Sequence, residues 1–407
     1  MPEHVVITGW GVLNAVGEDV SSFAESLEPG FCGVTLDEAD GLGLNARMSA
    51  VPFAERLARR TLPEPLIQRA RRAGNRATRP VQTALLGALE AWEQARLEAD
   101  DVHLVVAGHN MALADQYRAF EKFREHPEYL SARHALQFMD TDHVGTLSDV
   151  LGLREEGLTV GGASASGNVG LLEGWRRVRA GWCRACVVVG GMADLSPVER
   201  QAFFQTGAMG GKRFAHEPAR ACRPFDADRE GFIPGQGAAC LILEGEESAR
   251  ARGAEALGRL AGAALCLDGN RLSDPNPEGE ARAMGKAIDA AGLSIDDIDT
   301  VNAHGTSSVA GDAAEIEALK AVFGARLPEI PINATKGLTG HGLYAAGLIE
   351  AVASLIQLRR GFLHPNRNLD NPMDPEIRFV GPAAEPFAGR SVLSNAFGFG
   401  GINTAVV

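Results

Sequence analysis

The sequence predicts an α/β protein whose two similar halves pack as one body. Short apolar runs typical of buried strands alternate with amphipathic helical patterns along the 407 residues, as in proteins whose sheets are covered by helices. The same alternation starts again near residue 246, and no low-complexity linker separates the two parts. We therefore expect one half over residues 1–246 and another over residues 247–407.

Each expected element rests on its own pattern, because short apolar runs predict strands and helical spacing of apolar residues predicts helices. In the first half we expect a strand over 4–12, a helix over 81–97, a strand over 102–111, a strand and helix within 157–181, and a strand over 186–194. In the second half an apolar run over 251–267 leads to a helix over 279–293, a strand over 298–308, a helix over 311–324, a strand over 330–337, a helix over 347–361 and a closing segment over 391–407.

The charge pattern excludes one class of function and suggests a partner. A net charge of −13 at pH 7 argues against extended nucleic-acid binding, because little counterion release would drive it. Residues 56–79 depart from this balance, with eight arginines and a single acid, Glu64. This segment is either a solvated helical face or a docking patch for an acidic partner. The residues expected to form the patch are Arg69, Arg71, Arg72 and Arg76.

Cysteine usage and the apolar runs indicate the environment of the chain. Six cysteines in so long a chain do not resemble a disulfide framework. Cys183 and Cys186 lack the second ligand pair of a zinc site, so we expect them in the core. The apolar runs are too short to cross a bilayer, and Met1 to Val12 lacks the pattern of a signal peptide. We expect a cytoplasmic protein without membrane contact.

The segment 157–181 reads GLTVGGASASGNVGLLEGWRRVRAG and contains a candidate reactive residue. Ser164 lies between the expected strand and helix, where free N–H groups favour negative charge. This is a position for a nucleophile, although a serine here is commonly only a helix cap. The segment fails the G-x-S-x-G pattern of α/β-hydrolases, because Ser166 stands where the last glycine should fall. No obvious base lies beside Ser164 in the sequence.

Two histidines follow expected strands of the second half. His304 leads into a loop that contains Thr306 and Ser308, and His341 lies five residues after Lys336 in a glycine-rich turn. Neither has a cysteine or carboxylate at metal-ligand spacing, so we expect paired hydrogen-bond donors rather than a metal site.

Taken together, several segments resemble the β-ketoacyl synthase family, the condensing enzymes of fatty-acid and polyketide assembly. They are HVVITGWGVLNAVG at 4–17, CRPFDADREGFIPGQGAACLILE at 222–244, HGTSSVAGDAAEIEAL at 304–319, NATKGLTGHGLYAAG at 333–347 and NAFGFGGIN at 395–403. The last of these lacks the lysine and following helix of a phosphate-binding loop. The resemblance implies a thiolase-like, five-layered αβαβα fold and a homodimer.

The resemblance also implies roles for individual residues. In this family a cysteine at the position of Ser164 takes the acyl chain as a thioester, and two histidines, here His304 and His341, support decarboxylation of a malonyl group. The other implied residues are Lys336, Glu315 and Asp312 in a supporting polar network, Thr306 and Ser308 as pantetheine contacts, and Phe397 and Phe399 as an apolar gate. No cofactor is implied, because the substrate is carried on the phosphopantetheine arm of an acyl carrier protein.

The serine is the departure from the family pattern. A serine is less ionised and less nucleophilic than an activated cysteine, and neither histidine is expected to act as its general base. Acyl transfer should fail and decarboxylation should survive. The chain therefore resembles the decarboxylating ketosynthases of polyketide β-branching, which supply acetyl-carrier protein to an HMG-CoA-synthase-like partner.

Three alternatives remain from the sequence. The chain resembles a non-catalytic chain-length factor in lacking the cysteine, but retention of His304, Lys336 and His341 argues against a purely structural role. An acyltransferase or condensing enzyme that uses Ser164 would keep the same histidines. An engineered Cys→Ser ketosynthase would have the same sequence pattern.

Overall fold

Two mixed β-sheets with the same strand order form the frame of the protein. The computed structural model describes residues 3–37, 43–270 and 274–407. The first sheet has the order β5-β4-β6-β7-β1-β8 and the second the order β11-β10-β14-β15-β9. The strands of the first sheet are β1 (Val5–Asn14), β4 (Val102–Ala107), β5 (Gly157–Val160), β6 (Ala185–Gly190), β7 (Gly237–Gly245) and β8 (Gly258–Arg259). Those of the second are β9 (Ala263–Leu267), β10 (Thr300–Asn302), β11 (Ile332–Asn333), β14 (Val392–Gly398) and β15 (Ile402–Val406).

The sheets reveal an internal repeat. If β8 is left out, each sheet has five strands, which can be numbered 1 to 5 by their order along the chain. In space, both sheets then have the strand order 3-2-4-5-1. In both, the first two pairings in this order are parallel and the last two are antiparallel. The two similar halves are therefore confirmed as one repeated topology. The exact boundary at residue 246 stays a prediction.

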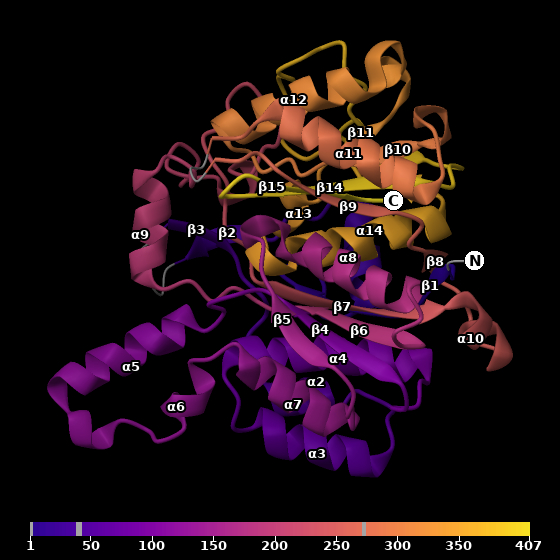
Figure 1. Cartoon of the computed structure of the whole chain (residues 1–407). Coiled ribbons are helices and arrows are strands. Elements are labelled where there is room, and N and C mark those ends of the chain that lie inside the picture. The colour runs from indigo at the N-terminus through magenta and orange to yellow at the C-terminus, as the bar shows by residue number, and fades with distance from the viewer. Residues whose placement is uncertain (1–2, 38–42, 271–273) are drawn as a thin grey trace.

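Helices complete five layers, αβαβα (Figure 1). One outer layer packs on the first sheet through α4, the middle layer of α8 and α14 contacts both sheets, and α11 and α12 cover the second sheet. The helices are α1 (Val20–Leu27), α2 (Phe53–Leu57), α3 (Glu64–Gly74), α4 (Arg79–Ala95), α5 (Leu113–Glu125), α6 (His134–Gln137), α7 (Thr141–Leu151), α8 (Ser166–Arg179), α9 (Pro197–Gln205), α10 (Glu246–Ala251), α11 (Pro277–Ala291), α12 (Val309–Phe323), α13 (Lys336–Thr339) and α14 (Ala346–Arg360).

The middle layer explains why small residues are needed between the sheets. Helices α8 and α14 cross at Gly167 and Gly347, where a side chain on either glycine would come within 3.0 Å of the backbone of the other helix. Strand β6, which packs against α8, is wholly buried and carries no charged or amide side chain. Cys183 and Cys186 are buried as predicted.

Two parts of the fold lie outside the sequence expectations. The segment containing α5 and α6 projects from the body as an arm (Figure 1), and a small hairpin is formed by β2 (Val34–Asp37) and β3 (Gly43–Ala46). A second short antiparallel pair joins β12 (Phe362–Leu363) to β13 (Glu385–Pro386). Among the described residues, no helix combines the length and apolar character needed to cross a bilayer.

Candidate active site

Ser164 lies in a strained turn between β5 and α8. The turn is a single 3₁₀ unit, Ala163–Ala165, and Ala163 has a left-handed φ of 48°, a conformation costly for residues other than glycine. Ser166 holds the turn, because its hydroxyl accepts from the Gly162 N–H at 2.9 Å and donates to the Ala163 carbonyl at 2.7 Å. The Ser164 side chain is thereby directed into a cavity beside the start of α8.

His341 contacts Ser164 directly, although the two residues lie far apart in the sequence. Its Nε2 is 2.9 Å from the Ser164 Oγ. The Leu343 N–H donates to its Nδ1 at 3.3 Å, so the neutral ring carries its proton on Nε2. Burial, together with the charge of Lys336, holds the pKa of His341 well below its usual value. In this tautomer His341 donates a hydrogen bond to the Ser164 hydroxyl.

His304 has the same tautomer for a different reason. The Lys336 Nζ lies 3.2 Å from its Nδ1 and donates to the His304 carbonyl at 2.5 Å. An ammonium group can only donate, so the neutral ring of His304 carries its proton on Nε2. Burial lowers the pKa of His304 far below the ordinary value, and the charge on Lys336 and the neighbouring His341 add to this effect. The two rings meet edge to face with centroids 5.6 Å apart.

Lys336 is itself fully buried and needs a counter-charge. Glu350 on α14 provides it through an ion pair, with both side chains at most 2% exposed. Burial raises the pKa of Glu350 to about 7, against the opposing effect of Lys336. Glu350 was not predicted from the sequence, although a buried lysine requires such a counter-charge.

Glu315 and Asp312 on α12 support the site through backbone contacts. Glu315 accepts from the N–H groups of His304 and Gly305, both at 2.8 Å. Asp312 accepts from the N–H of Thr306 at 3.0 Å. Burial raises the pKa of Glu315 to about 7 and that of Asp312 to about 6. These carboxyl groups fix the loop that carries His304 and Thr306.

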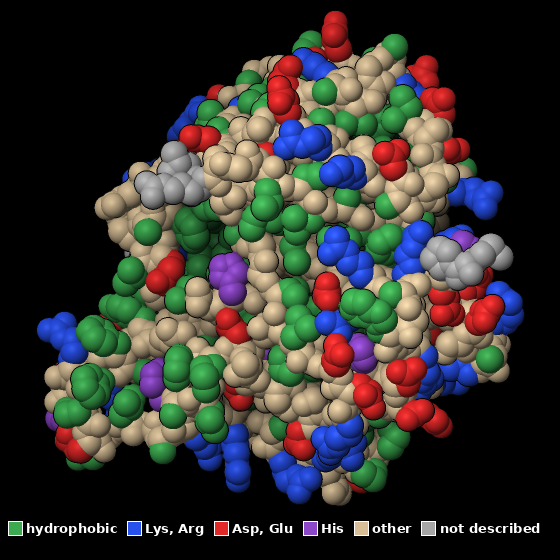
Figure 2. Space-filling view, in the orientation of Figure 1, with side chains coloured by type: hydrophobic (Ala, Val, Ile, Leu, Met, Phe, Trp, Pro, Cys, Tyr) green, Lys and Arg blue, Asp and Glu red, His purple; other side chains and the backbone are tan. Residues whose placement is uncertain are grey.

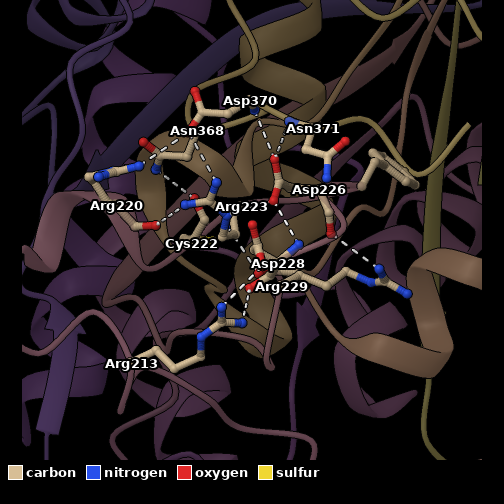
Figure 3. A network of polar contacts seen from close by, with 12 residues as sticks. Arg213, Arg220, Cys222, Arg223, Asp226, Asp228, Arg229, Asn368, Asp370 and Asn371 are labelled. Atoms are coloured by element: carbon tan, nitrogen blue, oxygen red, sulfur yellow. Dashed lines mark hydrogen bonds and ion pairs between the residues drawn. The ribbon is translucent and has the colours of Figure 1, made fainter. Parts of the chain in front are cut away.

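A network of polar contacts over residues 222–229 holds the same loop from outside (Figure 3). Asp226 is completely buried, pairs with the Arg223 Nε at 2.9 Å, and accepts from two backbone N–H groups at 370–371. Arg229 donates to the Ser308 carbonyl at 3.0 Å. Residues 222–229 thus tie the loop that carries His304 to the rest of the second half.

The histidines and the serine open into one cavity of about 510 Å³, a size typical of ligand sites. Figure 2 shows a hollow with apolar walls on this face, between α9 and the β14–β15 end of the second sheet. The sequence-predicted residues that line the cavity are Ser164, His304, Thr306, Ser308, His341, Phe397 and Phe399. Phe397 packs against His304, with ring centroids 5.4 Å apart, and Phe399 is 42% exposed. His109 and Tyr344, which were not predicted from the sequence, also line the cavity, with their rings tilted against each other and the centroids 4.8 Å apart.

The arginine segment divides into two groups. Arg56 and Arg59 form ion pairs with Glu18, and Arg60 pairs with Glu90. The four arginines expected to form the docking patch, Arg69, Arg71, Arg72 and Arg76, lie on or just after α3 in the outer layer and none lines the cavity. The Arg69 Nε donates to the Val150 carbonyl, whereas the other three are exposed without an ion pair in the described part of the chain.

The fold and the site define a class of protein: a thiolase-fold protein in which two buried imidazoles and a serine share one cavity. The family models agree. Residues 2–249 match the N-terminal domain of β-ketoacyl synthases and residues 257–370 match the C-terminal domain. The chain belongs to the β-ketoacyl synthase family.

Individual relatives refine the comparison. The chain is 38% identical to the polyketide biosynthesis malonyl-ACP decarboxylase PksF of Bacillus subtilis, with 100% of this chain and 96% of the relative covered. It is 39% identical over 60% of its length to 3-oxoacyl-[acyl-carrier-protein] synthase 2 of Mycobacterium tuberculosis, of which 58% is covered. A crystal structure of a β-ketoacyl synthase from Burkholderia phymatum superposes with a TM-score of 0.85 at 27% identity, covering 99% of this chain and 98% of that one. The ishigamide ketosynthase/chain length factor superposes with a TM-score of 0.87 at 26% identity, covering 100% and 98%.

Proposed function

We propose that this protein removes CO₂ from malonyl-acyl carrier protein and leaves acetyl-acyl carrier protein, without an acyl-enzyme intermediate. The observation that carries this proposal is that Lys336 Nζ and the Leu343 N–H lie against the Nδ1 atoms of His304 and His341, which leaves both Nε2–H groups to one cavity. The printed name of the PksF relative supports the same substrate and reaction.

The reaction needs little more than these donors. As the bond between the α-carbon and the carboxylate breaks, its electron pair forms an enolate and negative charge develops on the thioester oxygen. Two N–H donors in a buried site lower the barrier for this charge by about 3 kcal/mol each. CO₂ leaves, and the α-carbon of the enolate takes a proton from water to give the acetyl group. No step requires Ser164 as a nucleophile.

A second candidate function is favoured by the 2.9 Å contact between His341 and Ser164. An acyltransferase that uses the serine would need His341 to accept the serine proton, which requires the opposite tautomer. The Leu343 N–H opposes that tautomer. A non-catalytic chain-length factor would not require the Lys336–Glu350 ion pair or the two oriented histidines.

The decisive assay follows the mass of the carrier-bound acyl group with the purified protein alone. We expect malonyl-carrier protein to become acetyl-carrier protein while the mass of the enzyme stays unchanged. Ser164→Ala should retain most of the turnover. Malonyl-carrier protein that stays intact would refute the decarboxylase assignment, and an acyl adduct on the wild-type protein would favour the acyltransferase.

The proposal includes two kinds of partner. An acidic carrier protein would dock at Arg71, Arg72 and Arg76, whose exposed charges oppose the net charge of the chain. In the pathway, an HMG-CoA-synthase-like enzyme would consume the acetyl-carrier protein during polyketide β-branching in the cytoplasm.

A second copy of the chain would cover the arm, as in a homodimer. The arm exposes a set of large apolar side chains, seen at the lower left of Figure 2: Phe120, Phe123, Tyr129, Leu136, Phe138 and Met139. An apolar patch of this kind on a projecting segment is typical of a protein interface. Sedimentation of the wild type and a Phe120→Asp/Phe123→Asp variant tests this proposal, with dissociation of the variant expected.

A further inference from the structure

Glu280 is a buried carboxyl group that the proposed reaction does not use. It lies near the start of α11, is 1% exposed and lines the same cavity as His304 and Phe397. Within the described part of the chain, its Oε2 has no hydrogen-bond partner. Buried polar atoms in native proteins are almost always paired. An unpaired one in the wall of a substrate cavity therefore indicates a group that arrives with the ligand.

The surroundings of Glu280 determine what kind of group that is. The charged groups that act on it are all acidic: Glu315, Asp268 and Asp312. Burial, reinforced by these carboxyl groups, raises the pKa of Glu280 well above its usual value. A neutral carboxyl group both donates and accepts hydrogen bonds. This wall therefore suits a neutral polar ligand group and disfavours the carboxylate of a malonyl unit or a phosphate.

Asp268 extends the same wall. Its Oδ1 accepts from the Asn403 Nδ2 at 2.7 Å, and its Oδ2 is unpaired among the described residues. It packs so closely over α11 that a side chain on Gly279 would come within 1.7 Å of its Oδ1. The glycine before Glu280 therefore lets both carboxyl groups line the cavity.

The position of Glu280 separates it from the reacting atoms. Helix α11 packs against α12, which begins directly after Ser308, so Glu280 lies on the side of the cavity where Thr306 and Ser308 are found. Ser164, His109 and Tyr344 line the same cavity from other elements of the fold. A thioester placed between the histidines would extend its carrier arm past Thr306 toward Glu280. The neutral polar groups of that arm are two secondary amides and, farther from the thioester, a hydroxyl group.

We propose that Glu280 is a substrate-positioning residue that hydrogen-bonds a secondary amide of the pantetheine arm. The inference rests on the proposed function for its substrate class. It adds to the arm contacts of Thr306 and Ser308 a carboxyl group that recognises the amide itself.

The test uses three malonyl thioesters that lose amides stepwise: malonyl-pantetheine with two, malonyl-N-acetylcysteamine with one, and the malonyl thioester of ethanethiol with none. For Glu280→Ala we expect kcat/KM for CO₂ release to fall about tenfold with the thioesters that carry the recognised amide. With the ethanethiol thioester it should be unchanged. Glu280→Gln, which can still bond an amide, should recover most of the loss. Glu278→Ala on the exposed face of the same helix is the matched control and should behave as wild type with all three.

Thermal unfolding of the same variants provides a second readout. Because Glu280→Ala removes an unpaired buried carboxyl group, its Tm should equal or exceed that of the wild type. An equal loss of kcat/KM with all three thioesters, or no loss with any, would overturn the inference. If the wild type releases no CO₂ at all, the proposed function fails. The inference about Glu280 is then tested by ligand binding alone. Glu280→Ala must weaken the binding of acetyl-pantetheine about tenfold and leave the binding of S-ethyl thioacetate unchanged.

Discussion

Ala163 and Leu343 begin matching 3₁₀ turns in the two halves, with left-handed φ angles of 48° and 49°. Each turn follows the third strand of its half and leads into one helix of the middle layer, α8 or α14. Because the halves repeat one topology and these helices cross closely, both strained turns lie at the same cavity. Ser164 thus comes from the first turn, while the second turn supplies the backbone N–H that fixes the tautomer of His341.

The first prediction concerns the two imidazole donors. Replacing either His304 or His341 by alanine should lower kcat for malonyl-carrier protein about 10²–10³-fold, the usual size for one lost oxyanion donor. Ser164→Ala should cost much less, since the hydroxyl only accepts from His341. The rate of acetyl-carrier formation measures both effects. Loss of turnover in Ser164→Ala as complete as in the histidine variants would contradict the mechanism.

Ser164→Cys should restore acyl-enzyme formation. The backbone N–H groups at the start of α8 and the donor His341 would stabilise a thiolate at this position, lowering its pKa. After incubation with an acetyl thioester, intact-protein mass spectrometry should show one added acetyl group on the variant and none on the wild type. An unmodified cysteine variant would mean that the turn no longer activates a thiol.

Variants of the Lys336–Glu350 pair should change the stability and the activity of the protein to different extents. Lys336→Met leaves Glu350 buried without its cation and should lower the free energy of unfolding by about 3 kcal/mol. The double variant Lys336→Met/Glu350→Gln should recover most of that stability in urea unfolding. Its kcat should nevertheless stay about 10–100-fold low, because His304 Nδ1 has lost the donor that orients the ring. Recovery of both quantities would show that the lysine has only a structural role.

Charge reversal at Arg71 and Arg72 should weaken use of the carrier-bound substrate. We expect KM for malonyl-carrier protein to rise about tenfold, while turnover of malonyl-pantetheine is nearly unchanged, because exposed charges act on encounter with an acidic partner. Arg250→Glu on α10, which also reverses an exposed arginine, is the control. An equal loss of activity with malonyl-carrier protein and malonyl-pantetheine would exclude α3 as the docking surface.

His143 on α7 should make stability depend on pH. It is buried, neither ring nitrogen has a hydrogen-bond partner among the described residues, and burial lowers its pKa to about 4. The unfolded chain binds a proton near pH 6.5 and the folded protein does not, so this contribution is full above pH 6.5 and is lost as pH falls toward 4. Between pH 7.5 and 5 the loss is about 2 kcal/mol. Urea unfolding of His143→Leu should lack this part of the pH dependence, and identical pH slopes for variant and wild type would contradict the shift.

Part of the fold follows from local sequence patterns. The helix expected over 81–97 is α4 at Arg79–Ala95, and the helix expected over 347–361 is α14 at Ala346–Arg360, because apolar residues at helical spacing mark a face that must be buried. The arm was missed because its large apolar side chains are exposed in the single chain, so no core-facing pattern reveals it.

For the site, too, some features followed from the sequence and others only from the tertiary structure. The sequence by itself determined which reactive residues are present: a serine at a helix start, and two histidines and a lysine in glycine-rich loops. Only the tertiary structure decided what they do to one another, because the His341–Ser164 contact joins residues 177 positions apart. The same holds for the backbone N–H of Leu343, the buried charge of Glu350 and the unpaired carboxyl of Glu280, whose effects depend on burial and on orientation over a few ångströms. Residue identity sets which protons can be given or taken, whereas packing sets where they are held.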